Sequence, residues 1–223
     1  MDKDLFFQAI KKFILGLILI GILLFLPAGT FNYPNAWLFI ALLFIPMFIV
    51  GIILMFKAPD LLARRLNAKE EESEQKLVVL ISGLMFVSAF VMAGLNFRYG
   101  WNKLPDAIVL IAAIIFLLAY VLYGEVLREN RYLARTVEVE SNQELIDTGL
   151  YGIVRHPMYT STIFLFLSIP LILGSLYSFI ILLIYPILIV FRINNEEKVL
   201  ERELNGYGEY KNNVKYKLIP GIW

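Results

Sequence analysis

The sequence contains no cysteine and only one histidine, His156, among its 223 residues. Without cysteine the chain can form neither disulfides nor thiolate metal sites, and it has no cysteine nucleophile. A single histidine with no carboxylate cluster at metal-ligand spacing argues against a metal enzyme. Phosphate-binding loops of the P-loop type and of the G-x-G-x-x-G type are also missing. We therefore expect no metal site in this protein.

Charged residues are scarce. They make up 17% of the chain, hydrophobic residues make up 59%, and the mean hydropathy is +0.72. A soluble domain is about 25% charged, so this composition indicates an integral membrane protein whose partner is the lipid bilayer. The net charge of +1 gives no positive field that would attract nucleic acid, and we expect no nucleic-acid partner.

Long uncharged runs predict the membrane spans of the first half. Phe13–Phe56 has no charged residue over 44 positions. A span needs about 20 residues, so this run predicts two helices, separated by the turn residues of Pro27–Asn35. Although three lysines precede the run, it is too long for a signal peptide, and we expect the first span to be retained. Leu77–Phe97 and Ala107–Gly124 are predicted as the third and fourth spans.

The second half contains one longer uncharged run, Pro157–Phe191, of 35 residues. Gly174–Ser178 divides this run, which predicts a tight helical hairpin with a proline in each arm. From Arg192 the last helix is expected to leave the membrane and end near Leu204. The polar stretch 57–76 is interpreted as a loop.

These elements predict an all-α polytopic membrane protein with about six transmembrane helices. Residues 1–127 would form a scaffold of about four spans, and residues 128–223 a catalytic region. Eighteen of the 20 lysine and arginine residues fall on one side in this arrangement. Because cytoplasmic segments are rich in Lys and Arg, both termini are predicted to be cytoplasmic.

A hairpin brings its two ends together at that cytoplasmic side. One end carries Arg155, His156 and Tyr159, and the other carries Arg192 and the pair Glu196–Glu197. Arg192 and Glu196 are four residues apart, so they share a helix face. Such a pocket would suit a zwitterionic soluble cofactor. The alternative is an ordinary interfacial cluster of ion pairs.

The order of motifs in the last two-fifths of the chain resembles a known group of membrane enzymes. Gly149-Leu-Tyr and Val154-Arg-His-Pro-Met-Tyr159 precede the hairpin. Arg192 and Glu196-Glu197 follow it, and Leu218-Ile-Pro220 closes the pattern. This order is similar to that of isoprenylcysteine carboxyl methyltransferases and of phospholipid methyltransferases. The resemblance covers roughly residues 130–220.

The resemblance implies a methyltransferase that uses S-adenosylmethionine and a hydrophobic or membrane-delivered methyl acceptor, of the isoprenylcysteine carboxylate type. It implies that the cofactor is held by Gln143, Glu144, Leu145, Ile146, Tyr151, His156, Pro157, Met158, Tyr159 and Glu196. Arg192 would bind the acceptor, and the catalytic residues would be Arg192, Glu196 and His156. The chain departs from the family at Gln143, where histidine is frequent, and at Thr136, where the prenylcysteine enzymes commonly have glutamine.

Several alternatives remain open from the sequence. His156 would contact the cofactor, act as a general base, or only start a helix. The acceptor would also fit a phospholipid amine or a small thiol. Membrane sterol reductases carry a similar Arg-His-Pro-Asn-Tyr element, so an NADPH-dependent reductase is the rival enzyme. A membrane transport or structural protein is the non-enzymatic alternative, although the uncharged runs lack the ionisable residues that a transporter needs within its spans.

Overall fold

The computed structural model describes residues 3–67, 73–134, 136, 139 and 142–223. These residues form helices and connecting loops and contain no strand. The prediction of an all-helical membrane protein is confirmed. Glu70 and the rest of the acidic run in the 57–76 segment lie outside the described residues.

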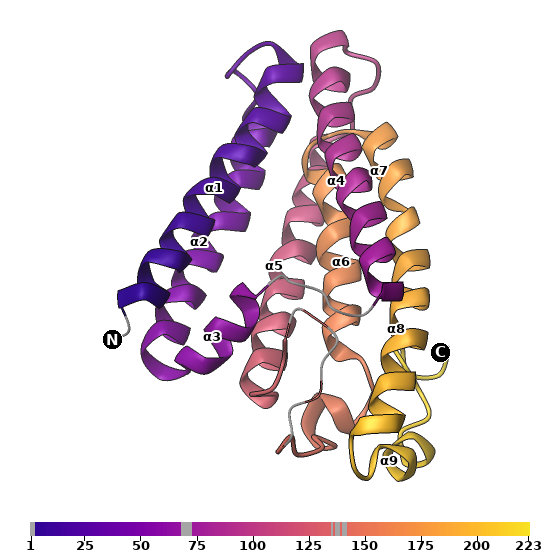
Figure 1. The fold of residues 1–223 in the computed structure, drawn as a ribbon. Helices are drawn as coiled ribbons and strands as arrows, with labels where there is room; N and C mark the ends of the chain where they lie inside the picture. Colours follow the sequence, from indigo (N-terminus) through magenta and orange to yellow (C-terminus); the bar gives the residue numbers. More distant parts are fainter. Residues whose placement is uncertain (1–2, 68–72, 135, 137–138, 140–141) are drawn as a thin grey trace.

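The first half of the chain supplies the longest helices (Figure 1). They are α1 (Lys3–Ala28), α2 (Pro34–Lys57), α4 (Ser73–Tyr99) and α5 (Asp106–Glu129), with the short α3 (Pro59–Leu66) after α2. The four long helices are all long and apolar enough to span a membrane. They coincide with the four predicted spans and extend beyond each uncharged run by a few residues.

Helix α3 lies within the segment that the sequence predicted to be a loop, and that interpretation was wrong for Pro59–Leu66. Pro59 occupies the first turn, where its missing N–H costs no helical hydrogen bond. Leu61 and Leu62 are buried, while Arg64 and Arg65 lie in the last turn. The polar composition of the segment hid this short amphipathic helix.

The predicted hairpin is present. Helix α6 (Pro157–Ile172) turns at Leu173–Ser175 into α7 (Leu176–Leu182), which continues after Leu183 as α8 (Ile184–Glu203). Pro186 explains the interruption, because proline cannot donate to the carbonyl four residues earlier, that of Leu182. Pro170 lies inside α6 as expected, whereas Pro186 lies in the first turn of α8.

The number of spans remains a prediction. Residues 176–203 together are long enough to cross a membrane, which gives five candidate spans among the described residues. Helix α6 is apolar but has only 16 residues, about 24 Å at the rise of an α-helix. The hydrocarbon core of a bilayer is about 30 Å thick, so α6 would be the sixth span only as a short one.

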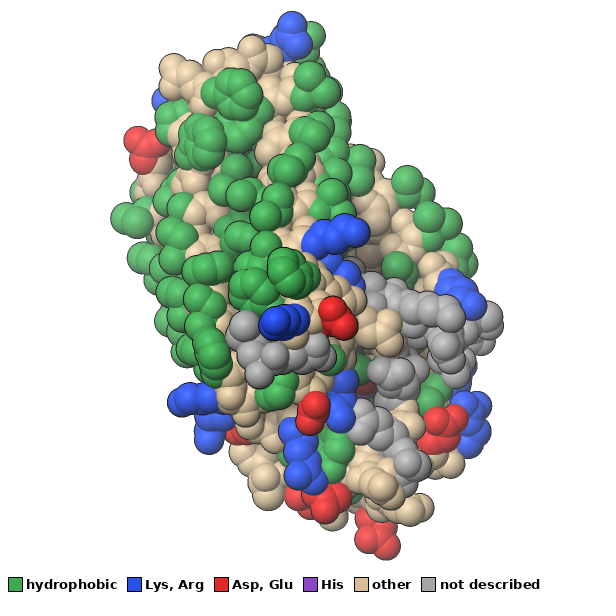
Figure 2. Space-filling view, turned by 60° about the vertical axis from the view of Figure 1, so that its left-hand side comes forward, with side chains coloured by type: hydrophobic (Ala, Val, Ile, Leu, Met, Phe, Trp, Pro, Cys, Tyr) green, Lys and Arg blue, Asp and Glu red, His purple; other side chains and the backbone are tan. Residues whose placement is uncertain are grey.

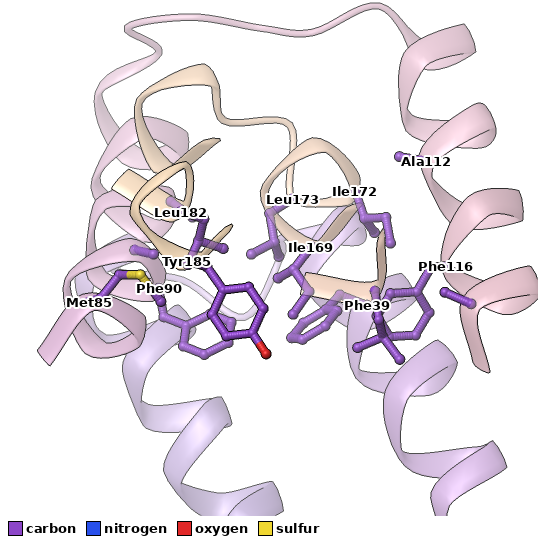
Figure 3. Close-up of a cluster of buried hydrophobic side chains, with 14 of the residues drawn as sticks. Phe39, Met85, Phe90, Ala112, Phe116, Ile169, Ile172, Leu173, Leu182 and Tyr185 are labelled. Carbon is purple, nitrogen blue, oxygen red and sulfur yellow. The ribbon is translucent and has the colours of Figure 1, made fainter. Parts of the chain in front are cut away.

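The core lies where α4, α5, α6 and α7 meet, with α1 and α2 against them (Figure 3). Phe39, Phe116 and Ile172 are fully buried there. Helices α1 and α4 approach closely at Gly94, where a Cβ would lie 2.7 Å from the carbonyl oxygen of Leu24. Only glycine allows this approach, and small residues are the usual means by which membrane helices pack.

Large hydrophobic side chains are exposed along α1, α2, α4 and α5. Figure 2 shows such side chains over most of one face, with charged side chains gathered towards its lower end. A broad exposed apolar belt is costly in water and favourable in lipid. The chain is therefore a multi-pass membrane protein.

Candidate active site

One cavity joins the ends of the hairpin to the segment before it. It has about 840 Å³ of empty space, including its opening to solvent. Its walls come from the chain just after α5, the 3-10 helix η1 (Gly149–Gly152), the start of α6, the second half of α8 and the short α9 (Tyr207–Asn213). All these elements lie at the same end of the bundle (Figure 1).

The structure brings nearly all the predicted site residues to this cavity. Its lining includes Gln143, Glu144, Leu145, Ile146, Tyr151, His156, Met158, Tyr159, Arg192 and Glu196. Pro157 is the exception: it is fully buried as the first residue of α6 and does not line the cavity. The roles that the resemblance implies for these residues stay predictions.

The loop before α6 depends on Gly149, whose φ is +59°. The backbone N–H of Leu150 donates to Glu129 Oε2 at 2.8 Å, which fixes the loop to the end of α5. A Cβ at position 149 would lie 2.1 Å from Glu129 Oε1. Glycine thus allows both the left-handed backbone and the close approach of the carboxylate, and this places Tyr151 against Asn130, whose Nδ2 donates to Tyr151 Oη at 2.9 Å.

We expect Gly149→Ala to cost more stability than the same change at Gly100, which has a similar φ of +63° but no atom near an added Cβ. Both variants pay about 1–2 kcal/mol for a left-handed alanine. Gly149→Ala should lose a further 1–3 kcal/mol, roughly, because Glu129 must move away from the Leu150 N–H. Denaturant titration in mixed micelles measures the difference. Equal losses would show that the contact with Glu129 contributes nothing.

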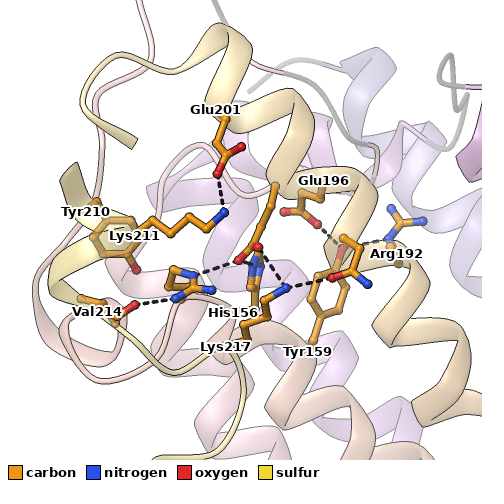
Figure 4. Close-up of polar contacts among 12 residues, drawn as sticks. His156, Tyr159, Arg192, Glu196, Glu201, Tyr210, Lys211, Val214 and Lys217 are labelled. Carbon is orange, nitrogen blue, oxygen red and sulfur yellow. Dashed lines mark hydrogen bonds and ion pairs between the residues drawn. The ribbon is translucent and has the colours of Figure 1, made fainter. Parts of the chain in front are cut away.

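The two ends of the hairpin meet at Tyr159 (Figure 4). Its hydroxyl donates to Glu196 Oε2 at 2.5 Å and accepts from Arg192 Nε at 2.8 Å. Arg192 and Glu196 therefore share a helix face, as their spacing predicted, and α6 supplies the group between them. The result is a carboxylate and a guanidinium on the wall of one cavity, held at fixed positions by a buried phenol.

Glu197 faces away from Glu196 into a buried ion-pair cluster. Its Oε1 accepts from Arg155 Nε at 2.8 Å and lies 3.2 Å from His156 Nε2, while Oε2 lies 3.0 Å from Lys217 Nζ. Arg155, His156 and Glu197 are all at most 6% exposed. The ion-pair interpretation is thus right for Arg155 and Glu197, and the cavity interpretation places Glu196 on its wall.

His156 belongs to both groups. It lines the cavity and immediately precedes α6 as the N-cap residue, and its ring contacts Glu197. A histidine whose Nε2 is engaged by a carboxylate has a fixed ring orientation. His156 therefore combines a place at the start of the helix with a place on the cavity wall.

The C-terminal tail holds the Arg155–His156 segment in place. The backbone N–H groups of these two residues donate to the carbonyl oxygens of Tyr216 and Lys217, both at 2.9 Å. Arg155 Nη1 also donates to the carbonyl oxygens of Val214 and Lys215. The sequence gave no sign of this pairing, because it joins segments about 60 residues apart.

Tyr207 and Tyr210 on α9 contribute more than the tail packing expected of them. Both are buried in a cluster with Leu204 and also line the cavity. Tyr210 Oη donates to the carbonyl oxygen of Tyr151 at 2.7 Å. Tyr207 Oη is buried without a hydrogen-bond partner among the described residues. Such a group costs stability unless a ligand satisfies it.

Burial raises the pKa of Tyr151, Tyr207 and Tyr210 above the usual range. Their hydroxyls are therefore protonated donors at any physiological pH. Sequence reasoning also missed several lining residues whose types carry no chemical signal, namely Asn130, Tyr132, Leu133, Ala134, Leu200 and Leu204.

Comparison with known proteins places this region among membrane enzymes. Residues 107–206 match the model of the phospholipid methyltransferase family. The match confirms the resemblance to the integral membrane methyltransferases, and it contains α6, α8 and most of the cavity lining. The first 106 residues lie outside it.

A Delta(14)-sterol reductase from Mus musculus is 29% identical over 91 residues. The aligned part covers 40% of this chain and 22% of the reductase, so the chain spans about a fifth of that relative's length. This similarity agrees with the Arg-His-Pro element that the sequence shares with membrane sterol reductases.

Proposed function

We propose that this protein is a methyltransferase that uses S-adenosylmethionine and transfers a methyl group to a hydrophobic acceptor delivered from the membrane. The observation that carries the proposal is the single cavity in which Tyr159, Arg192 and Glu196 meet inside the region matched by the phospholipid methyltransferase family. Residues 128–223 would form the catalytic region, and residues 1–127 the scaffold.

The residues around the cavity fit this cofactor. It carries an amino-acid moiety with both charges and a ribose with two hydroxyls. Glu196 offers an acceptor for the ammonium group or a ribose hydroxyl, and Gln143 offers an amide for the ribose or the carboxylate. Tyr207 offers a buried hydroxyl that has no partner among the residues described here. Leu145, Ile146 and Met158 supply apolar wall beside these groups.

The chemistry asks little of the protein beyond position. Bound S-adenosylmethionine supplies an electrophilic methyl carbon: the acceptor's lone pair forms the new bond while the carbon–sulfur bond breaks and its electron pair stays on sulfur. The residues must therefore align the acceptor and exclude water. Arg192 is positioned to hold an acidic acceptor group, since Tyr159 fixes its guanidinium at the cavity.

The nature of the acceptor decides whether a base is needed. A carboxylate is ionised at neutral pH and needs none. An amine or a thiol acceptor must lose a proton, and His156 and Glu196 are the titratable groups of the cavity wall that would accept it. We favour the carboxylate, because the cavity presents an arginine to it.

An NADPH-dependent sterol-type reductase is the second candidate, supported by the similarity to the mouse Delta(14)-sterol reductase. The family match over residues 107–206 and the glutamate pair after the hairpin favour the methyltransferase.

We further propose that the cavity faces the cytoplasm. The Lys and Arg residues are concentrated at the end of the bundle that carries the cavity, and Arg98 and Lys103 lie in the connection at the other end. Because the protein has no cysteine of its own, a cysteine placed at Lys103 gives a clean test. It should react with a membrane-impermeant maleimide added outside intact cells, and a cysteine at Lys211 should not. The reverse pattern would invert the proposed topology.

The decisive experiment is calorimetric titration of the purified protein in detergent with S-adenosylhomocysteine and, separately, with NADPH. We expect saturable binding of S-adenosylhomocysteine. Binding of NADPH alone would replace the proposal by the reductase.

A further inference from the structure

A second hollow lies outside the candidate active site, between α1, α2 and α3. It has about 1050 Å³ of empty space, including its open side. Its walls are almost entirely apolar and include Phe6, Phe13, Met47, Phe48, Met55 and Phe56. On α2 the lining runs from Met47 to Phe56, about 13 Å along the helix axis. A hollow of this length and lining suits a hydrocarbon chain.

The groove has a positive charge at one wall. Lys12 and Arg65 both line it, and no Asp or Glu is among its described lining residues. Lys12 Nζ donates to the carbonyl oxygen of Leu66, and Arg65 donates to neutral oxygens of Ala134 and Tyr123 and to the sulfur of Met158. These bonds use three of the five N–H donors of Arg65, so two remain for a ligand. The charge pattern fits an amphiphile with an anionic headgroup.

Arg65 connects this groove to the candidate active site. Its Nη1 lies 2.8 Å from the carbonyl oxygen of Ala134 and 3.9 Å from Met158 Sδ. Ala134 and Met158 both line the active-site cavity. A headgroup bound by Arg65 would therefore lie at the wall that the two hollows share. The residues of the groove lie between positions 6 and 66, outside the region matched by the methyltransferase family.

We propose that the groove between α1, α2 and α3 binds the hydrocarbon chain of the methyl acceptor, and that Arg65 and Lys12 bind its acidic headgroup next to the active-site cavity. The assignment of the ligand as the acceptor rests on the proposed methyltransferase function. The acceptor class that follows is a single-chain amphiphile with an anionic head. The first helices, which match no part of the family, would then select the substrate.

Gly51 offers a direct way to fill the groove. It lines the groove, and an added Cβ would meet no atom within 4 Å. Gly51→Leu therefore places a side chain in the hollow without colliding with the protein. Gly83 on α4 is equally open and lies away from the groove, so Gly83→Leu is the matched control.

The probe is palmitate with a diazirine at the end of its chain, added to the full-length protein in phosphatidylcholine nanodiscs and photolysed. We expect cross-links to map to residues 6–13 and 47–56. Gly51→Leu should reduce them at least fivefold, and Gly83→Leu should leave them unchanged. Arg65→Gln and Lys12→Gln should reduce them as well, whereas Lys11→Gln, a neighbouring lysine outside the lining, should not. Unchanged labelling of Gly51→Leu would overturn the proposal.

Two further arms separate the remaining outcomes. The same diazirine on phosphatidylcholine tests for an ordinary bilayer lipid, and labelling of the groove equal to that by palmitate would overturn the assignment to an anionic single-chain ligand. Titration with S-adenosylhomocysteine tests the cofactor separately, and Gly51→Leu should bind it like the wild type. Palmitate labelling without any S-adenosylhomocysteine binding would leave the groove as an amphiphile site and remove the methyltransferase.

Discussion

Replacement of Glu196 by alanine is expected to weaken the binding of S-adenosylhomocysteine by about 10- to 150-fold. The variant removes the carboxylate that α8 presents to the cavity and that accepts a hydrogen bond from Tyr159. A hydrogen bond to a charged group contributes about 1.5–3 kcal/mol, which corresponds to this range of affinity. Calorimetric titration of the purified variant measures the loss.

Glu201→Ala is the matched control for this loss. Glu201 lies on the same helix, is exposed and pairs with Lys211, and it does not line the cavity. Its replacement should leave the affinity unchanged. Glu196→Gln should fall between the two, because the amide oxygen can still accept a hydrogen bond while the charge is gone. Wild-type affinity in Glu196→Ala would mean that this carboxylate does not contact the cofactor.

Glu197→Ala is expected to act on stability instead, lowering the free energy of unfolding by about 3–5 kcal/mol. Glu197 is the partner of Arg155, and both side chains are at most 6% exposed. Removing the carboxylate leaves a buried guanidinium without its counter-ion, with His156 and Lys217 nearby. Denaturant titration in mixed micelles gives the loss.

The control is Glu203→Ala on the same helix. Glu203 forms an exposed ion pair with Arg202, and such pairs contribute about 0–1 kcal/mol. If Glu197→Ala cost no more than Glu203→Ala, the buried cluster would not stabilise the fold. Because Arg155 and His156 also bind the backbone of the tail, Glu197→Ala should in addition expose residues 214–217 to proteolysis, and Glu203→Ala should not.

The sequence predicted the membrane helices well, since their signal is local. A run of 20 or more uncharged residues has to be buried in lipid, whatever surrounds it. The turn at Gly174 and the end of the last helix near Leu204 were predictable for the same reason, and α8 ends at Glu203. Helix α3 was missed because eight mostly polar residues carry too weak a local signal.

The candidate site was predictable only in part. The spacing of Arg192 and Glu196 put both on one helix face, and the hairpin put that face near Tyr159. The contributions of Tyr207, of the C-terminal tail and of Arg65 depend on contacts between segments far apart in the chain. No local pattern encodes such contacts, because they arise only when the helices pack.

Glu196 and Glu197 mark the boundary between the two kinds of information. The sequence alone determined that a pair of carboxylates follows a membrane hairpin, and that consecutive residues of a helix point about 100° apart. Only the tertiary structure decided which of the two faces the cavity beside Tyr159 and which is buried against Arg155 and Lys217. The physical reason is that the rotation of α8 about its axis is set by its packing against α4 and α6 and by the tail that closes over it.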